Sequence, residues 1–327
     1  MDKELMKTKR LFYILGALGI FAALLIFPEA ASAAVKDGLN MCAGVIIPSL
    51  FPFFAATNLI NELGISKLIG NALSPLSAKL FGVSGQGATS FIIGVTGGYP
   101  LGAAYIAGLR HQQVISADEA SRLLIFCNNS GPAFIIGAAG IGIFKSSPVG
   151  FFLYAVHILA ALIWGVILNN GKIGDICYDS DVLEKKSVAE AVTTAIKKSA
   201  EATINICAFI TAFSALNGIL DATGLFSSIA GEVSYHTGAE LSWCRALLAG
   251  FLELGNGIGS MYGLSISPLN LALASVILSW GGLSVHFQTF SMVSGTDIKT
   301  ARYMVGRFLI ALTSGALALL GGAAIFS

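Results

Sequence analysis

Charge is what this sequence lacks. Only 11% of its 327 residues are Asp, Glu, Lys or Arg, and 55% are hydrophobic. An average soluble domain is about one-quarter charged, so a soluble protein is excluded and a chain that crosses a lipid bilayer several times is indicated. The net formal charge is +1, so the composition gives no reason to expect nucleic acid as a partner.

Metal-ligand and catalytic motifs are also missing. The five cysteines form neither a CxxC pair nor a Cys/His group, and four of them lie in apolar runs, which is typical of packing residues. The sequence has no Walker-type loop, HExxH sequence or nucleophile elbow, and no strand precedes its glycine-rich stretches as a dinucleotide loop requires. We therefore predict no metal site, no cofactor and no enzymatic activity.

The first apolar run follows a basic flank. Lys7, Lys9 and Arg10 precede residues 11–27, and residues 30–34 are small and alanine-rich. A signal peptide has the same pattern, but we favour a first transmembrane helix because the rest of the chain is apolar too. In either interpretation the N-terminus lies in the cytoplasm, as in a multi-pass protein of the cell (inner) membrane.

Further apolar segments follow after a short outer loop predicted at residues 28–37. Residues 38–60 should form a span kinked at Pro48 and Pro52. Two weaker segments, 64–83 and 224–237, suit either a re-entrant hairpin or an interfacial helix. Uninterrupted spans are expected at residues 148–168, 203–220 and 303–325, and the mixed charges of residues 170–198 indicate a cytoplasmic connector.

Four other spans are broken by residues that do not suit a helix in lipid. Residues 128–132 read Asn-Asn-Ser-Gly-Pro, and the proline both lacks an N–H and disfavours helix in the residue before it. In lipid the backbone groups freed by a break cost on the order of several kcal/mol each unless protein or cavity water satisfies them. We therefore expect the breaks to face protein groups or a water-filled cavity and not lipid. The other three breaks lie at residues 97–102, 253–259 and 281–288.

A helix start is predicted ahead of the break at residues 128–132. Ser116 and Glu119 have the spacing of a capping box, in which each side chain satisfies a backbone N–H of the other's residue. On the helix that follows, Arg122 is expected near an interface or paired with Asp118; otherwise it would help to attract an anion.

The same order of elements occurs twice, in residues 38–169 and 199–327. NMCA at residues 40–43 is echoed by NICA at residues 205–208, and each half continues with a weak segment, a glycine-broken span, a second break and a clean final span. The first half starts outside and the second inside. The predicted fold class is therefore all-α, a polytopic membrane protein with two inverted-topology repeats and broken or re-entrant helices. A duplicated scaffold with packing glycines and no substrate is the alternative.

Polar residues at the breaks are the candidate substrate-binding residues. Glu253 is a candidate for binding a coupling cation or proton, or else for an internal hydrogen bond that pins the break. His286 is a candidate proton-linked group or a structural histidine, and His157 is expected to be a packed, hydrogen-bonded residue. The other candidates offer donors, acceptors or a stacking face: Gly98, Tyr99, Asn128, Asn129, Ser130, Asn256, Ser284 and Gln288.

Four motifs, taken in order, resemble one known family. They are SLFPFF at residues 49–54, GYPLGA at 98–103, NNSGP at 128–132, and GLSVHFQ at 282–288 ahead of Thr296-Asp297-Ile298. This pattern is similar to the YlbJ-type (SpoVV) sporulation integral membrane proteins, which carry nucleoside-recognition (Gate) domains. The resemblance implies a multi-pass inner-membrane protein of a spore-forming bacterium that moves dipicolinic acid from the mother cell toward the forespore. Gate domains also occur in concentrative nucleoside transporters, which are built from inverted repeats with re-entrant hairpins.

The sequence thus predicts a secondary transporter that works by alternating access, without ATP hydrolysis of its own. Its substrate would be a small polar or anionic organic molecule, with dipicolinic acid implied by the resemblance. Expected partners are the lipid bilayer and that solute, with a proton or Na+ as candidate coupling ion and a homo-oligomer as one candidate assembly. Two alternatives stay open: a non-transporting membrane assembly protein of sporulation, and a nucleoside-type permease.

Overall fold

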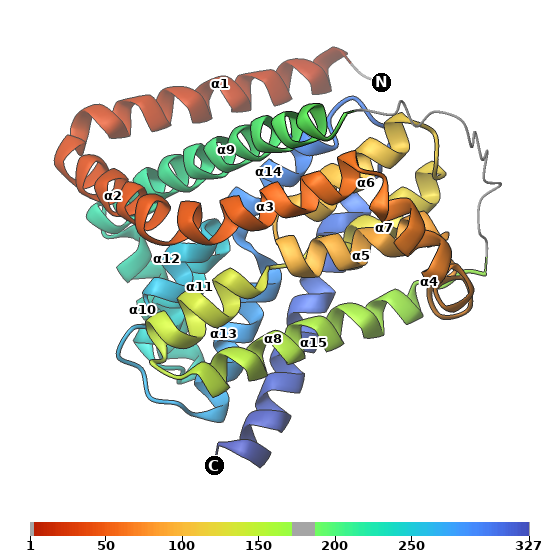
Figure 1. Ribbon diagram of the computed structural model, residues 1–327. Coiled ribbons are helices and arrows are strands. Elements are labelled where there is room, and N and C mark those ends of the chain that lie inside the picture. Colours follow the sequence, from red (N-terminus) through yellow and green to blue (C-terminus); the bar gives the residue numbers. More distant parts are fainter. Residues whose placement is uncertain (1–2, 172–186, 327) are drawn as a thin grey trace.

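The computed structural model describes residues 3–171 and 187–326, and within these ranges the chain forms helices and no strand (Figure 1). Among the described residues, four helical segments are long and apolar enough to cross a membrane: α8 (Ser147–Ile167), α9 (Val188–Ala222), the pair α13–α14 (Pro268–Met292) and α15 (Thr300–Ile325). A fifth crossing results if the bent pair α1–α2 counts as one span. The predicted fold class, an all-helical polytopic membrane protein, is confirmed.

The expected outer loop at residues 28–37 is wrong, because these residues are helical. Helix α1 (Lys3–Ile26) ends before Pro28, and α2 (Pro28–Met41) begins there at an angle of 97° to it. Proline suits the first turn of a helix, and the alanines that follow are the best helix formers, so Lys36 and Asp37 are carried on a helix. The π-helical segment η1 (Cys42–Ile46) and α3 (Ile47–Glu62) continue from α2.

The beginnings of the two halves lie side by side. Helix α9 packs along α2 and α3, and the Cys42 thiol lies 3.9 Å from the Cys207 carbonyl oxygen, so the NMCA and NICA sequences meet. A Cβ on Gly38 would lie 2.9 Å from Ser214 Oγ, which shows how closely α2 approaches α9. Helix α9 begins inside the predicted connector, whose residues 172–186 lie outside the described residues.

Each of the two weak segments is a single helix and not a hairpin. Helix α4 (Ile65–Phe81) lies between Gly64 and Gly82, and α10 (Leu225–Thr237) lies between Gly224 and Gly238. All four glycines have positive φ, which other residues rarely adopt, so the chain turns sharply at both ends of both helices. Leu68 on α4 is 69% exposed, as suits a helix that lies at an apolar interface.

Helical hairpins lie instead in the next segment of each half. In the first, α5 (Gly85–Gly97) and α6 (Leu101–His111) are arranged so that a Cβ on either Gly94 or Gly102 would overlap the same carbonyl oxygen, that of Cys127. A straight helix would separate these two glycines by about 12 Å, so the chain must reverse between them.

The second hairpin is formed by α11 (Leu241–Leu252) and α12 (Leu254–Gly259). A Cβ on Gly257 would overlap Gly250 Cα, although a straight helix would set these residues about 10 Å apart. Gly250 and Gly257 therefore let the two arms touch through their backbones.

Two broken helices and two clean helices complete the halves. Helix α7 (Ala117–Cys127) is separated from the π-helical η2 (Ala133–Ile143) by the break at residues 128–132, and α13 (Pro268–Trp280) is separated from α14 (Gly282–Met292) at Gly281. Helix α8 closes the first half and α15 the second. Each half therefore contains, in order, a short helix, a hairpin, a broken helix and a long apolar helix.

The capping box predicted at the start of α7 is only half formed. Ser116 Oγ accepts the backbone N–H of Glu119 at 3.2 Å, as predicted. The Glu119 carboxylate turns away and accepts hydrogen bonds from the backbone N–H and hydroxyl of Ser84, both at 2.7 Å. Because Ser84 is the N-cap of α5, this carboxylate joins the start of α5 to the start of α7.

Candidate functional site

The four breaks meet inside the molecule. A Cβ on Gly98 would lie 2.8 Å from the backbone nitrogen of Gly131, so the tip of the first hairpin touches the break between α7 and η2. A Cβ on Gly281 would lie 3.4 Å from the hydroxyl of Tyr99, which brings the same tip to the break between α13 and α14. A Cβ on Gly282 would lie 3.1 Å from Glu253 Cα, where the second hairpin turns. The contacts therefore run from the first hairpin through both broken helices to the second hairpin.

Arg307, on α15, is fully buried at the centre of these contacts. Its Nη1 donates to the Ile125 carbonyl at 3.4 Å and to Asn129 Oδ1 at 3.3 Å. Its Nη2 donates to the Tyr99 hydroxyl and to the Ser279 carbonyl. One guanidinium thus reaches three of the four breaks or the helix ends beside them, and no carboxylate in the described ranges forms an ion pair with it.

His157, on α8, links the two broken helices. Its Nε2 accepts the backbone N–H of Ser130 at 3.1 Å, and its Nδ1 lies 2.8 Å from Ser279 Oγ. The expectation of a packed, hydrogen-bonded histidine is met, but its partners are break residues and the last turn of α13. His157 is 1% exposed, so these bonds form away from bulk water.

A second polar group surrounds the Tyr303 hydroxyl. Asn128 Nδ2 donates to it at 3.1 Å and to Thr289 Oγ1 at 2.8 Å, and His286 Nδ1 lies 3.1 Å from it. The His286 ring also meets the Trp280 ring edge to face, with centroids 4.3 Å apart. Asn128 and His286, predicted from opposite halves of the sequence, therefore share one partner.

Two predicted residues belong to the second hairpin. Glu253 is 2% exposed and is the N-cap of α12, where its carboxylate accepts the backbone N–H of Asn256 at 2.7 Å. The Asn256 side chain donates to Ser214 Oγ on α9 at 3.2 Å. Both therefore hold the hairpin in place, and the internal hydrogen bond considered for Glu253 is present.

The remaining predicted residues, Ser284 and Gln288, are buried on α14. Four buried polar atoms around the breaks have no hydrogen-bond partner within the described residues: Asn128 Oδ1, Ser284 Oγ, His286 Nε2 and Arg307 Nε. Buried polar atoms are rarely left unpaired, so these four have unused capacity for a ligand or water.

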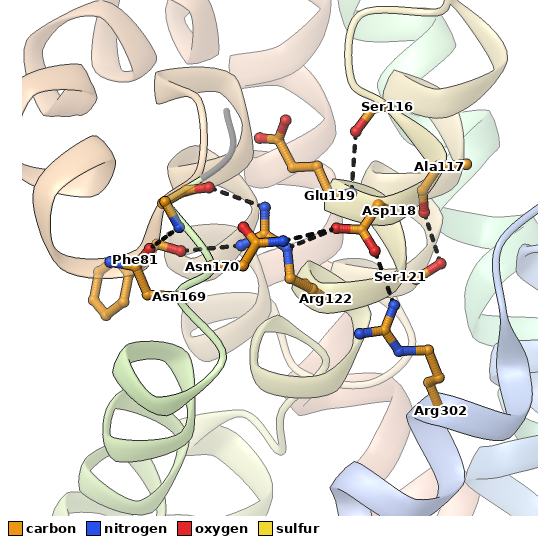
Figure 2. A network of polar contacts seen from close by, with 12 residues as sticks. Phe81, Ser116, Ala117, Asp118, Glu119, Ser121, Arg122, Asn169, Asn170 and Arg302 are labelled. Atoms are coloured by element: carbon orange, nitrogen blue, oxygen red, sulfur yellow. Dashed lines mark hydrogen bonds and ion pairs between the residues drawn. The ribbon is translucent and has the colours of Figure 1, made fainter. Parts of the chain in front are cut away.

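Arg122 lies outside this cluster, in the network of Figure 2. Its Nε donates to Asp118 at 3.2 Å, and its other nitrogens donate to the carbonyls of Phe81 and Gly82 at the end of α4. Arg302 of α15 reaches the same Asp118 at 2.9 Å. The pairing with Asp118 that was one expectation is present: Arg122 joins α4 to α7, and Asp118 extends the network to α15 through Arg302.

Five residues of the site were not found from the sequence: Ser214, Ser279, Thr289, Tyr303 and Arg307. Arg307 had a signal, because it is an ionisable residue inside a predicted apolar span. The others are hydroxyl residues of a kind that occurs throughout apolar helices, and only the tertiary contacts separate them from the rest. Among the described residues, no group of three or more His, Cys, Asp or Glu side chains forms a potential metal site.

Comparison with known proteins agrees with this architecture. Residues 43–147 match the Gate family, described as nucleoside recognition. The sporulation integral membrane protein YlbJ of Bacillus subtilis (strain 168) is 29% identical over 320 residues, which cover 89% of this chain and 78% of YlbJ. The chain is similar to YlbJ over most of its length and carries a match to the Gate model. The resemblance inferred from the four motifs is confirmed.

Solved structures of CNTnw share the fold of this chain. One, in an inward-facing substrate-bound state, is 16% identical with a TM-score of 0.54 and covers 97% of this chain and 86% of CNTnw. Another, of a variant in an intermediate state, is 15% identical with a TM-score of 0.58 and covers 99% of this chain and 87% of CNTnw. At these identities the likeness shows the fold alone, which is an all-helical fold.

Proposed function

We propose that this protein is a secondary transporter that carries a small polar or anionic organic solute by alternating access. The meeting of four helix breaks carries the proposal, because transporters with inverted repeats form their sites where discontinuous helices meet. Freed backbone groups at membrane depth need protein, water or a ligand as partners. Residues 38–169 and 199–327 are the two repeats that would move against each other, with residues 1–37 preceding them and residues 170–198 joining them.

Dipicolinic acid is the proposed solute. The similarity to YlbJ, a sporulation protein by name, supports a role in sporulation. The buried Arg307, which has no carboxylate partner among the described residues, favours an anionic molecule over a neutral one. Asn128, Asn129 and Ser130 would supply hydrogen bonds, with Tyr99 and His286 beside them.

The proposed location is the cytoplasmic membrane with the N-terminus inside. The basic residues before the first apolar run support this orientation, because positively charged flanks stay in the cytoplasm.

Uptake into proteoliposomes tests the proposal. Purified protein should move labelled dipicolinate across the bilayer, and Asn129→Ala, Glu253→Ala and His286→Ala should each lower the rate. Matched controls are Asn205→Ala, Glu201→Ala and His236→Ala, which remove the same groups from exposed positions and should leave the rate unchanged.

Uridine uptake in parallel separates the two transport hypotheses. Movement of uridine but not dipicolinate would replace the proposed solute with a nucleoside. Movement of neither, with no effect of the three site variants on either solute, would contradict the transporter and favour the assembly protein.

A further inference from the structure

The oxygen atoms around Arg307 have an arrangement that suits a cation. Ile125 and Ser279 lie in the last turns of α7 and α13, whose carbonyls carry the partial negative charge of a helix C-terminus. Asn129 Oδ1 and the Tyr99 hydroxyl complete a set of four oxygen atoms on the two terminal nitrogens. In transporters with broken helices, unwound carbonyls and half-helix C-termini are the groups that hold a coupling cation.

The carbonyl ends of α7 and α13 stabilise the guanidinium of Arg307 in place of a carboxylate, and its formal charge of +1 therefore stays in the site. Arg122 makes a useful contrast, since it also caps carbonyls at the end of a helix but has the Asp118 carboxylate beside it. Only Nε of Arg307 lacks a partner, and the face of the Tyr99 ring lies 5.5 Å from the guanidinium carbon. Four of the five guanidinium N–H groups are thus committed to the protein, so little of the group is left to bind a solute directly.

The close packing of α15 on α7 fixes the position of Arg307. A Cβ on Gly306 would lie within 2.9 Å of the Ile125 Cγ1 atom, so α15 approaches α7 closely at the residue just before Arg307. The guanidinium cannot leave with a solute or an ion, because it is part of the chain.

We propose that Arg307 is a built-in cation that stands where the carbonyl ends of α7 and α13 would otherwise hold a dissociable Na+, so that this site needs no metal cation. The inference rests on the proposed transport function and deepens it. Under this proposal, solute transport is not coupled to a Na+ ion bound at this position. The Arg307 side chain keeps one positive charge in the site throughout the transport cycle.

Thermal unfolding of the full-length protein in detergent gives a test that does not depend on transport. The Tm of the wild type should be the same in NaCl and in choline chloride at equal ionic strength. Arg307→Ala should unfold at a lower temperature, and Na+ or methylguanidinium, but not choline, should raise its Tm by about 3–5 °C when it saturates the vacated position. The matched control is Arg245→Ala, which removes an arginine paired with Asp221 at the surface and should respond to neither cation.

Several results would overturn the proposal. One is a wild-type Tm that Na+ raises relative to choline. Another is an Arg307→Ala protein that responds to neither cation, even if it loses dipicolinate binding, because the arginine would then be a solute ligand. If Arg307→Ala does not fold, Arg307→Lys keeps a tethered cation and should be indifferent to Na+; a Na+-dependent Lys variant contradicts the proposal.

Uptake into proteoliposomes then separates this inference from the proposed function. Wild-type uptake should be equal with and without a Na+ gradient at constant pH, and a Na+-driven rate would count against the built-in cation. Failure to take up any solute would contradict the transporter but would leave the unfolding result to decide the role of Arg307.

Discussion

At the scale of single residues, buried hydroxyl groups organise the site. The Tyr303 hydroxyl accepts from Asn128 and lies against His286, so one phenol joins the break after α7 to α14. The neighbouring Thr289 hydroxyl also accepts a hydrogen bond from the Asn128 amide, and it lies within hydrogen-bonding distance of the Tyr303 hydroxyl. The amide and the two hydroxyls therefore form a closed triangle of hydrogen bonds. Removing one hydrogen-bond partner of a buried polar group lowers the stability of the folded state, because water cannot replace that partner.

Tyr303→Phe should therefore destabilise the protein by about 1–3 kcal/mol, because the Asn128 amide and the His286 ring each lose a partner without gaining water. Thermal unfolding in detergent measures the change. Tyr235→Phe serves as control, since Tyr235 is 84% exposed and its hydroxyl can be hydrated. Equal Tm values for both variants would show that the triangle adds nothing to stability.

At the scale of elements, close backbone contacts at glycines set the packing of the hairpins. Gly94 and Gly102 place both arms of the first hairpin against the end of α7, where a side chain of any size would meet the Cys127 carbonyl. Small residues at helix contacts are the usual means of close approach in membranes.

Gly94→Ala should lower stability by about 1–3 kcal/mol or more, because the added methyl group overlaps a backbone oxygen that cannot move alone. Gly108→Ala is the matched control on α6: a Cβ there meets nothing within 4 Å, and the change should be neutral or stabilise by about 0.4–1 kcal/mol. The two variants are compared by folded yield after detergent extraction and by Tm. A tolerated Gly94→Ala would contradict the packing of α5 on α7.

An ion pair also joins α6 to the turn before α15. Arg110, in the last turn of α6, contacts Asp297 in the turn between α14 and α15 at 2.8 Å. The hydrogen bond from Arg110 holds the pKa of the Asp297 carboxyl below its usual range. A carboxyl group with a lowered pKa stabilises the folded state above its unfolded pKa, about 3.9, and loses that effect as the pH falls through its folded pKa.

Asp297→Asn should accordingly lower Tm at neutral pH, and the difference from the wild type should vanish in acid, once the pH is below the folded pKa of Asp297. Arg110→Gln should reproduce the neutral-pH loss and show the same disappearance. A difference that persists unchanged in acid would mean that the pair does not act through its charge.

Sequence reasoning located the breaks because glycine, proline and amides interrupt helices locally. It missed α2 because Lys36 and Asp37 made a helix look like a loop, and it assigned Glu119 to the nearest N-cap when its partner, Ser84, lies 35 residues away. Arg307 was overlooked although its apolar surroundings marked it. What the sequence could not supply was pairing across the fold, such as Tyr303 with Asn128, which depends on how the helices assemble.

At the scale of the whole molecule, the two halves share a long contact at their beginnings. Helices α2 and α3 pack along α9, and Gly38 faces Ser214 so closely that an added Cβ would lie 3.1 Å from Ser214 Cβ. This distance is near the range of about 3.5–4.5 Å that a disulfide requires. The contact adjoins the second hairpin, because Ser214 Oγ also accepts a hydrogen bond from Asn256, so it joins the beginnings of both halves to one of the breaks.

Gly38→Cys with Ser214→Cys, in a background without the five native cysteines, should form a cross-link between the halves on mild oxidation. A protease site placed within residues 172–186 would then leave one covalently joined species on a gel. Gly44→Cys with Ser214→Cys is the control, because a Cβ on Gly44 meets nothing within 4 Å. Cross-linking of the control but not of the test pair would contradict the arrangement of α2 and α9.

The contact of His157 with both broken helices decides where the imidazole carries its proton. A backbone N–H can only donate, so Nε2, which faces Ser130, must be the unprotonated nitrogen and Nδ1 must hold the hydrogen that points to Ser279. A second proton on this ring, at Nε2, would place its N–H opposite the backbone N–H of Ser130. The hydrogen bond between them would be lost, and with it the link between α7 and α13. The tautomer of His157, readable from its nitrogen chemical shifts, therefore reports whether the two broken helices are linked through this ring.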